Sequence, residues 1–426
     1  MPEFAPFQLG REKDRITISG TFAAQDVRRV LAAIHDAVNK RGYSEVELDF
    51  SRCTSAFSAA MLPLCAHALQ LRSNRIDFRL VMPASERLAR LFDNTGWSNF
   101  LCPRDHETPR RNGLGKQFPA AIYTSHEQQD MLLNELLEKL LAVIPNFNRT
   151  AFAAVEWALN EITDNVTNHS QSSIGGLLQL SVFDVAKQKV EFTVADAGLG
   201  VAQTLRSAKP EIASDVDALL QAVRSGVTRN AKDFQGNGLY GTLEICRAGG
   251  GRFTLNAGHA ALICANGTVQ AKNEPIPYTG TTVDALIDFS VPSLLEKALA
   301  IDGVVHKPVD YIELKYEQDD LKAIPFRVRE QALSFRSRPA GRPVRTKLAN
   351  LIENCPGQIL FVDFENITVV SSSFADEVFG KLFVELGPMR FMQTVRLINV
   401  SPTVQALIDR AIKQRMQNPA ITDYGE

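Results

Sequence analysis

A polar stripe on the predicted helix over residues 151–170 carries side chains suited to chemistry. Glu161 and Asn165 are four residues apart and therefore stack on one face of a helix, with Asn168 and His169 a turn further on. A carboxylate and a carboxamide at this spacing suit a general base and an oxygen ligand to Mg²⁺, a cation that uses few protein ligands and leaves the rest to phosphates and water. The alternative is that the stripe is only the solvated face of an amphipathic helix.

The other side of the same stretch is apolar. Its members recur at steps of three and four residues, namely Phe152, Val155, Leu159, Ile162 and Val166. This spacing places them on one seam of a helix that faces a core. The helix therefore has a buried seam that can hold the polar stripe in place.

A second group of candidate residues ends the predicted strand KVEFTVAD. Asp196 stands at the end of this strand and can accept a hydrogen bond from an exocyclic amine. Gly198 and Gly200 follow at alternate positions and allow backbone to approach a ligand closely. A tight turn with no ligand would show the same pattern.

A third group is the glycine run Gly236, Gly238 and Gly241, which reads G-x-G-x-x-G. The residues before it, TRNAKDFQ, are polar and do not predict a strand, so the dinucleotide-binding fingerprint is excluded. The phosphate-binding pattern G-x-x-x-x-G-K-[ST] is also absent from the sequence. What remains is a flexible glycine loop that opens a helix, whose free N–H groups and positive dipole end suit a polyphosphate.

Composition limits the class of protein. The 426 residues are 45% hydrophobic and carry a formal net charge of -2, which predicts two to four globular domains and gives no general reason to expect nucleic acid as a partner. The six cysteines are scattered without a C-x-x-C pair, so neither a zinc ribbon nor a disulfide framework is indicated. The sequence has no signal pattern and no apolar run of about 18 residues, and we expect a cytoplasmic protein.

The first hundred or so residues are predicted to alternate between strand and helix. Residues 15–22, 46–50 and 75–83 predict strands, each followed by a helix, and Ser85 and Gly96 mark the ends of the last one. Residues 103–121 are rich in Pro, Gly and charge, which favours a boundary there.

The central region predicts a Leu-rich helix before residue 145 and then the helix described first. GLLQLSVFDV and KVEFTVADAG form a predicted hairpin. Three further strands are expected in GRFTLNAG, AALICANGTVQ and GTTVDALIDF, and Gly280 and Thr281 open the last of them.

Four elements thus occur in a fixed order: E-x-x-x-N on a helix, D-x-G-x-G after a strand, G-x-G-x-x-G before a helix, and a late Gly-Thr on a strand. Together they resemble the N, G1 and G2 boxes of the GHKL (Bergerat-fold) ATPase superfamily, which includes gyrase, heat-shock chaperone ATPases, histidine kinases and anti-sigma-factor serine kinases. The resemblance covers roughly residues 120 to 292. It implies an α/β sandwich with a mixed sheet and helices on one face.

The resemblance also implies roles for single residues. It implies that Asn165 ligates Mg²⁺, that Glu161 is the catalytic base, and that Asp196, helped by Thr281, accepts from the adenine amino group of ATP. The remaining nucleotide-binding positions would be the glycines and the residue between them, namely Gly198, Gly200, Gly236, Gly238, Leu239 and Gly241.

An ATP lid is implied between Val201 and Gln235. Arg229 and Lys232 in it could reach phosphate oxygens, or could be solvated loop cations. His169 is similar to the histidine that ends the N box of anti-sigma kinases, and a satisfied helix-end histidine is the alternative.

The chain repeats one unit on either side of this centre. Asp49 and Asp363 each open a connection to a helix, and Ser58 and Ser372 each lie nine residues later. The unit resembles the STAS fold of anti-sigma-factor antagonists, in which a serine at this position is the phosphoacceptor. The C-terminal copy, about residues 300 to 420, resembles a STAS-like domain of unknown function found beside bacterial ATPases.

Both copies depart from the antagonist pattern Asp-Ser-Ser-Gly. Phe57 stands in place of the Asp and Ala60 in place of the Gly, while Ser371 and Phe374 stand at these places in the second copy. Helix N-capping is therefore the alternative role for both serines. A basic stretch from Arg327 to Lys347 could contact phosphates or an acidic partner, or could be a solvated face.

The expected organisation is α/β, with a STAS-like domain at 1–105, a GHKL ATP-binding domain at 106–295 and a STAS-like domain at 296–426. The expected function is an ATPase that couples nucleotide state to a protein partner in bacterial signalling or regulation. A partner-switching serine kinase and a non-hydrolysing nucleotide-sensing scaffold, as in a defence operon, are the alternatives. The expected cofactors are ATP and Mg²⁺; protein partners would bind through the STAS-like domains, a homodimer is left open, and neither a membrane nor a nucleic acid is expected.

Overall fold

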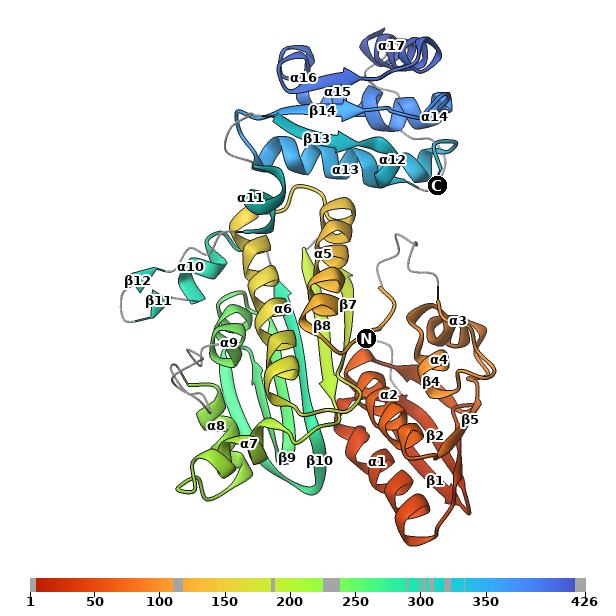
Figure 1. The fold of residues 1–426 in the computed structure, drawn as a ribbon, viewed down its shortest axis with the longest axis vertical. Helices are drawn as coiled ribbons and strands as arrows, with labels where there is room; N and C mark the ends of the chain where they lie inside the picture. Colours follow the sequence, from red (N-terminus) through yellow and green to blue (C-terminus); the bar gives the residue numbers. More distant parts are fainter. Residues whose placement is uncertain are drawn as a thin grey trace. The chain divides into compact units, whose positions relative to one another are not determined.

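The chain folds into two compact units, Met1–Leu136 with Ala154–His306 and Leu137–Ala153 with Lys307–Glu426, which we call unit 1 and unit 2. The computed structural model describes residues 5–109, 118–184, 188–224, 238–288, 290–298, 300–301, 304–305, 310–317, 323–332 and 334–417. Open sheets and helices make up both units, which confirms the α/β class (Figure 1).

The first sheet of unit 1 belongs to an N-terminal subdomain, residues 5–102. Its order is β1-β2-β3-β5, and the strands are β1 (Gln8–Glu12), β2 (Arg15–Phe22), β3 (Glu45–Asp49) and β5 (Asp77–Val81). A further strand, β4 (Cys53–Ala56), pairs with β2. Its sequence CTSA is short and partly polar, which is why the sequence predicts only a connection there.

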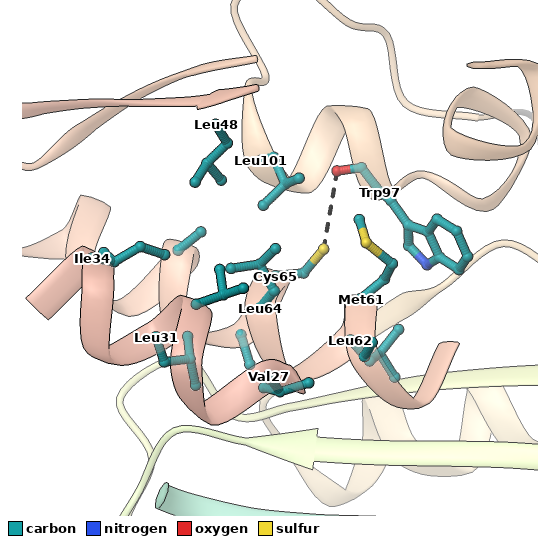
Figure 2. Packing of buried hydrophobic residues seen from close by; sticks show 14 of the residues in the cluster. Val27, Leu31, Ile34, Leu48, Met61, Leu62, Leu64, Cys65, Trp97 and Leu101 are labelled. Carbon is teal, nitrogen blue, oxygen red and sulfur yellow. Dashed lines mark hydrogen bonds between the residues drawn. The ribbon is translucent and has the colours of Figure 1, made fainter. Parts of the chain in front are cut away.

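The helices of this subdomain are α1 (Val27–His35), α2 (Ser58–Ser73), α3 (Glu86–Thr95) and α4 (Trp97–Leu101). Figure 2 shows apolar side chains of α1, α2 and α4 converging on one core, in which Leu31, Leu64 and Leu101 are buried. Gly96 ends α3 in the left-handed conformation (φ 79°), as the sequence predicts, because glycine adopts it without a Cβ penalty.

The second sheet of unit 1 has the order β6-β7-β8-β10-β9. Its strands are β6 (Ala121–Tyr123), β7 (Gly176–Asp184), β8 (Lys189–Asp196), β9 (Arg252–Ala265) and β10 (Thr268–Asp288). Every described pair is antiparallel, so the expectation of a mixed sheet is wrong. The sequence predicts three strands after residue 251, but the structure has only β9 and β10 in that region. Both β9 and β10 continue through irregular pairing near Gly258 and Tyr278.

One face of this sheet carries α5 (His126–Val143), α6 (Arg149–His169) and α9 (Gly238–Ala248) (Figure 1). The predicted apolar seam of α6 is confirmed, since Phe152, Val155, Leu159 and Ile162 are each at most 1% exposed. Two further helices, α7 (Val201–Ala208) and α8 (Asp215–Ala222), occupy the first part of the region expected to be a lid. Unit 1 also contains the short elements α10 (Leu294–Ala298), β11 (Ala300–Ile301) and β12 (Val304–Val305).

The other face of the sheet is covered by the N-terminal subdomain. Helix α2 packs along β8, and Leu177 and Ala195 of the sheet join the same apolar cluster as the subdomain's core. The buried Trp97 indole donates from Nε1 to Gln179 Oε1 at 2.8 Å. The subdomain is therefore one of the layers that enclose the sheet.

Unit 2 contains a parallel sheet of β13 (Ala323–Arg327), β14 (Ile359–Asp363) and β15 (Val395–Ile398). Its helices are α11 (Tyr311–Tyr316), α12 (Val328–Gln331), α13 (Arg338–Asn354), α14 (Ser372–Ala375), α15 (Lys381–Leu386), α16 (Pro388–Thr394) and α17 (Pro402–Gln417). The last residues of α5 and the first of α6 also belong to this unit.

The predicted repeat has a structural counterpart in the turn after the central strand. Asp49 Oδ1 accepts from Ser51 N, and Asp363 Oδ1 accepts from Glu365 N, both at 2.9 Å. The next residue in each copy, Phe50 or Phe364, is fully buried. Each aspartate thus fixes the turn by the same local side-chain to backbone bond.

The basic stretch from Arg327 to Lys347 contains both exposed cations and internal ion pairs, and its exposed members are Arg327, Arg329, Arg336 and Arg342. Lys347 is 2% exposed and pairs with Glu138, and Arg338 and Arg345 pair with the fully buried Glu377. Lys347 is therefore internal, while for the exposed arginines both alternatives, a phosphate or acidic partner and a solvated face, stay predictions.

Arg149, the first residue of α6, ties α11 to α6 within unit 2. Its Nε donates to Asp310 Oδ2 at 2.8 Å, its Nη2 to Glu317 Oε2 at 2.6 Å, and its Nη1 to the carbonyl of Asn354 at 2.8 Å. The side chains of Arg149, Asp310 and Glu317 are each at most 23% exposed. Removal of the guanidinium would leave two carboxylates without this partner.

We expect Arg149→Met to destabilise α11 and α13 by about 2–4 kcal/mol, because breaking a partly buried pair leaves uncompensated charge. Hydrogen exchange of peptides covering 310–317 and 338–354 measures this local free energy, which is better defined here than one global value for a chain of two units. Arg329→Met, at an exposed position of α12, is the control. Equal protection in both variants would contradict a stabilising role for the Arg149 pairs.

Candidate functional site

Helix α6 and the start of α9 bring the first candidate residues together. Gly238 begins α9 so close to α6 that a Cβ there would lie 2.5 Å from Glu161 Oε2 and 3.4 Å from Asn165 Nδ2. The carboxylate and the carboxamide therefore border one point at the N-terminus of a helix. This is where partial positive charge from free N–H groups favours an anion.

The pKa of Glu161 is raised to about 7, chiefly because burial disfavours its charged form and secondly because the Asp164 carboxylate is near. A carboxyl group that titrates near neutrality exchanges protons readily at that pH. Asp164 itself is held by its neighbours, since it lies 3.4 Å from His126 Nε2 and accepts from Asn168 Nδ2 at 2.7 Å. Glu161 is thus the carboxylate of this stripe with the properties of a base.

The Asn165 side chain is half-buried, and its Nδ2 is buried with no hydrogen-bond partner within the described residues. A buried amide group without a partner is costly, and in native structures such a group calls for an explanation. A carboxamide nitrogen with no partner in the described part of the chain fits a site that is completed by a ligand. The unpartnered Nδ2 is a donor that suits a phosphate oxygen, while the carboxamide oxygen and Glu161 suit a hard cation held mainly by phosphates and water.

Asp196 ends β8 and is 1% exposed. Its Oδ1 accepts from Gly198 N at 2.8 Å and its Oδ2 from Thr281 N at 3.2 Å. Burial nevertheless raises the pKa of this carboxyl group to about 7, against the opposing effect of the two N–H donors. Each oxygen keeps a second acceptor position, so the carboxylate can accept from an amine.

Close backbone contacts hold the segments around Asp196 together. A Cβ on Gly198 would lie 2.0 Å from the Ser170 carbonyl, which also accepts from Leu199 N at 2.8 Å. A Cβ on Gly280, whose φ is +91°, would lie 2.2 Å from the Asp196 carbonyl. In the structure these glycines allow two backbone segments of the protein to lie in contact.

Thr281 serves α7 as well as Asp196. Its Oγ1 accepts from Val201 N at 3.0 Å, so it satisfies a free N–H of the first turn of α7, which follows Gly200 directly. The expectation that Thr281 helps to bind adenine stays a prediction. The structure places its backbone N–H on the Asp196 carboxylate.

The other predicted binding residues are divided between described and undescribed parts of the chain. Gly241 is buried within α9 and Leu239 is half-buried beside it. Gly236, Arg229 and Lys232 lie outside the described residues. His169 is the last residue of α6.

The two predicted phosphoacceptor serines have different surroundings, and neither is a helix cap. Ser58 is half-buried, and its Oγ lies 3.1 Å from Thr193 Oγ1, which donates to the buried Asp284 at 2.8 Å. The N-cap of α2 is Phe57. Ser372 is exposed, and Ser371 caps α14 by accepting from Phe374 N at 3.0 Å. The capping role expected for Ser58 and Ser372 is therefore wrong.

A cavity of about 500 Å³ lies beside the Asp196 loop and does not include Asp196, Glu161 or Asn165. It lies between α7 and the β9–β10 pair, and its lining includes Leu199, Arg206, His259, Tyr278 and Thr279. The described residues contain no group of three or more His, Cys, Asp or Glu side chains that could hold a metal ion. None of the helices in the described ranges is both long and apolar enough to span a bilayer.

Two residues of this region had no functional signal in the sequence. The sequence marks Ser170 only as the end of a helix, yet its carbonyl accepts from Leu199 N in the loop after Asp196. Tyr278 is 4% exposed, and its hydroxyl lies 3.3 Å from the Asp196 carbonyl. It stands between two register shifts of β10, where strand periodicity cannot predict the direction of a side chain.

Comparison with known proteins identifies one part of the chain. Residues 340–405 match the family model of a STAS-like domain of unknown function (DUF4325). This supports the expected STAS-like character of the C-terminal region, and it covers less than half of the chain. No curated protein matches.

We expect Glu161→Gln to raise stability at pH 8 but not at pH 4. The folded-state pKa, about 7, lies above the unfolded value of about 4.3, so the folded protein binds the proton more tightly. The bound proton on Glu161 thus stabilises the wild type fully below about pH 4. This stabilisation, on the order of 1–3 kcal/mol, is lost as the pH rises through 7. Calorimetric melting temperatures of variant and wild type across this range measure the difference. Glu127→Gln, exposed on α5, should show none, and a pH-independent difference for Glu161→Gln would refute the raised pKa.

Proposed function

We propose that unit 1 binds ATP with Mg²⁺ and hydrolyses it. The observation that carries this proposal is the pairwise convergence of four separate sequence elements. Gly238 meets Glu161 and Asn165, the Ser170 carbonyl meets Gly198, and the Thr281 N–H meets the Asp196 carboxylate. This is the order and grouping of residues that the resemblance to GHKL ATPases implies.

Asp196 would select the base in this proposal. A buried acceptor that loses its partner is costly, so a site built to accept from an amine discriminates against bases that lack one. Its two backbone donors fix the carboxylate in one orientation. A bound adenine amine would also favour the charged carboxylate, and hence lower the raised pKa of Asp196.

Asn165 and Glu161 would serve the phosphates. The carboxamide oxygen of Asn165 would ligate Mg²⁺, and the N-terminus of α9 would face the phosphate oxygens. Glu161, with a pKa of about 7, would take the proton of the attacking water. Bound Mg²⁺ would supply charge stabilisation on the phosphate oxygens.

Serine kinase activity on Ser58 in cis is less compatible with the geometry. Side chains alternate along β8, so Thr193, which contacts Ser58, and Asp196, three residues on, face opposite sides of the sheet. Ser58 therefore lies across the sheet from the proposed nucleotide site. Product analysis still separates the classes: free phosphate indicates an ATPase, phosphoserine a kinase, and neither a nucleotide sensor.

Asp196→Asn should weaken binding of ATP·Mg²⁺ by about 1–3 kcal/mol, roughly 5- to 150-fold, because an amide presents a donor where the adenine amine needs an acceptor. Titration calorimetry measures the affinity, and Asp130→Asn on the exposed side of α5 is the control. An unchanged affinity in the Asp196 variant would refute this assignment.

Glu161→Gln should retain ATP binding within about threefold and lose turnover by about 10²-fold or more, because the amide cannot accept a proton from water. Release of inorganic phosphate under saturating ATP measures turnover. Asp164→Asn, one turn along the same helix, should keep most of the activity. Equal turnover in wild type and the Glu161 variant would leave Glu161 a structural carboxylate and would favour the sensor.

A further inference from the structure

Tyr278 links the N-terminal subdomain to the backbone that carries Asp196. It lies in β10 between the register shifts at Asn273/Tyr278 and Tyr278/Thr281, and it is 4% exposed. Its hydroxyl donates to the Asp196 carbonyl at 3.3 Å and accepts from Thr282 Oγ1 at 2.8 Å. The phenol thus contacts the same residue whose carboxylate forms the candidate adenine site.

The other side of Tyr278 is held by two buried polar side chains of the N-terminal subdomain. The ring of His67, on α2, lies 5.2 Å from the Tyr278 ring in an edge-to-face arrangement, and its Nε2 lies 2.9 Å from the Thr279 carbonyl. The Arg28 guanidinium, on α1, lies 5.8 Å from the centre of the Tyr278 ring. Both side chains are at most 6% exposed.

Arg28 fixes the strands on either side of Tyr278 through backbone carbonyls. Its Nη1 donates to Gly258 O at 2.6 Å and to Ile276 O at 2.8 Å, and its Nη2 donates to Ala260 O at 2.7 Å. Bonds to charged groups are among the stronger hydrogen bonds in a low-dielectric interior. Where β9 and β10 lose their regular pairing, the Arg28 guanidinium of the subdomain donates to strand carbonyl groups in place of a neighbouring strand.

His67 makes its contact in the neutral form. Burial lowers its pKa to about 4, and the second cause is the neighbouring His35. Because a carbonyl can only accept, Nε2 carries the proton and donates to Thr279 O. The contact is therefore the same throughout the neutral pH range.

We propose that Tyr278 is a positioning residue for Asp196, and that His67 and Arg28, acting through it, make the N-terminal subdomain a determinant of the affinity of this site for adenine. This inference rests on the proposed ATP site. It adds that the subdomain senses occupancy of the site through Tyr278.

The physical basis is that one short segment carries both contacts. Residues 278–281 hold the Asp196 carbonyl through Tyr278 and the Asp196 carboxylate through the Thr281 N–H. A shift of this segment therefore moves the acceptor for the adenine amine. Coupling of this kind is reciprocal, so a bound nucleotide must in turn stabilise the packing of the subdomain by the same factor.

Tyr278→Phe keeps the ring and removes the hydroxyl. Its affinity for ATP should fall about three- to tenfold, the range expected for one lost hydrogen bond. Its affinity for purine riboside triphosphate, which lacks the 6-amino group, should not change. Tyr43→Phe, at a half-buried position before β3, is the matched control and should alter neither affinity.

The His67 variants test the contribution of the subdomain. His67→Leu should show the same selective loss for ATP, whereas His67→Gln, whose side-chain nitrogen can still donate to Thr279 O, should restore affinity. In an Asp196→Asn background Tyr278→Phe should cause no further loss, because both changes act on one group.

Each outcome bears on one of two claims. Equal losses for both nucleotides, or no loss for ATP in either Tyr278→Phe or His67→Leu, would overturn the positioning role while leaving ATP binding by the wild type intact. Failure of the wild type to bind ATP would overturn the proposed function and this inference with it.

Discussion

The burial of the Asp196 carboxylate is the constraint around which unit 1 is arranged. A buried carboxylate is tolerated only with donors directed at it, and here both donors are backbone N–H groups from separate segments, Gly198 and Thr281. To bring them there, the end of α6, the loop after β8 and the turn into the last part of β10 must approach within backbone contact distance. This is why glycine stands at positions 198 and 280, where a Cβ would overlap a carbonyl.

The sequence predicted what depends on local pattern. The apolar seam of α6 and the β7–β8 hairpin are each specified by residues close together in the chain, and both are confirmed. The convergence of Gly238 on Glu161 was implied only by the family resemblance, because spacing along the chain gives no distance between segments. Pattern therefore identified the candidate residues, and tertiary structure supplied their geometry.

The misses arose where distant residues decide the outcome. The sequence does not predict the burial of Lys347 or the pairing of Arg345, because their partners Glu138 and Glu377 are remote in sequence. The sequence predicts three strands where the structure has only β9 and β10. Gly258 and two prolines, Pro275 and Pro277, interrupt the alternation of apolar residues there. Donors from Arg28, more than 200 residues away, stabilise these interruptions.

The free energy stored in this site argues for a ligand. Glu161 and Asp196 both have pKa values of about 7, because burial disfavours their charged forms. At neutral pH the charged form of each therefore costs free energy that it would not cost in water. The Asn165 Nδ2 atom is buried with no partner among the described residues. A site that served only the fold would not need these three polar groups, because removing carboxyl groups and an unpartnered amide nitrogen from water reduces stability. Groups perturbed in this way are candidates for a functional site, and a nucleotide with its cation would supply partners to all three.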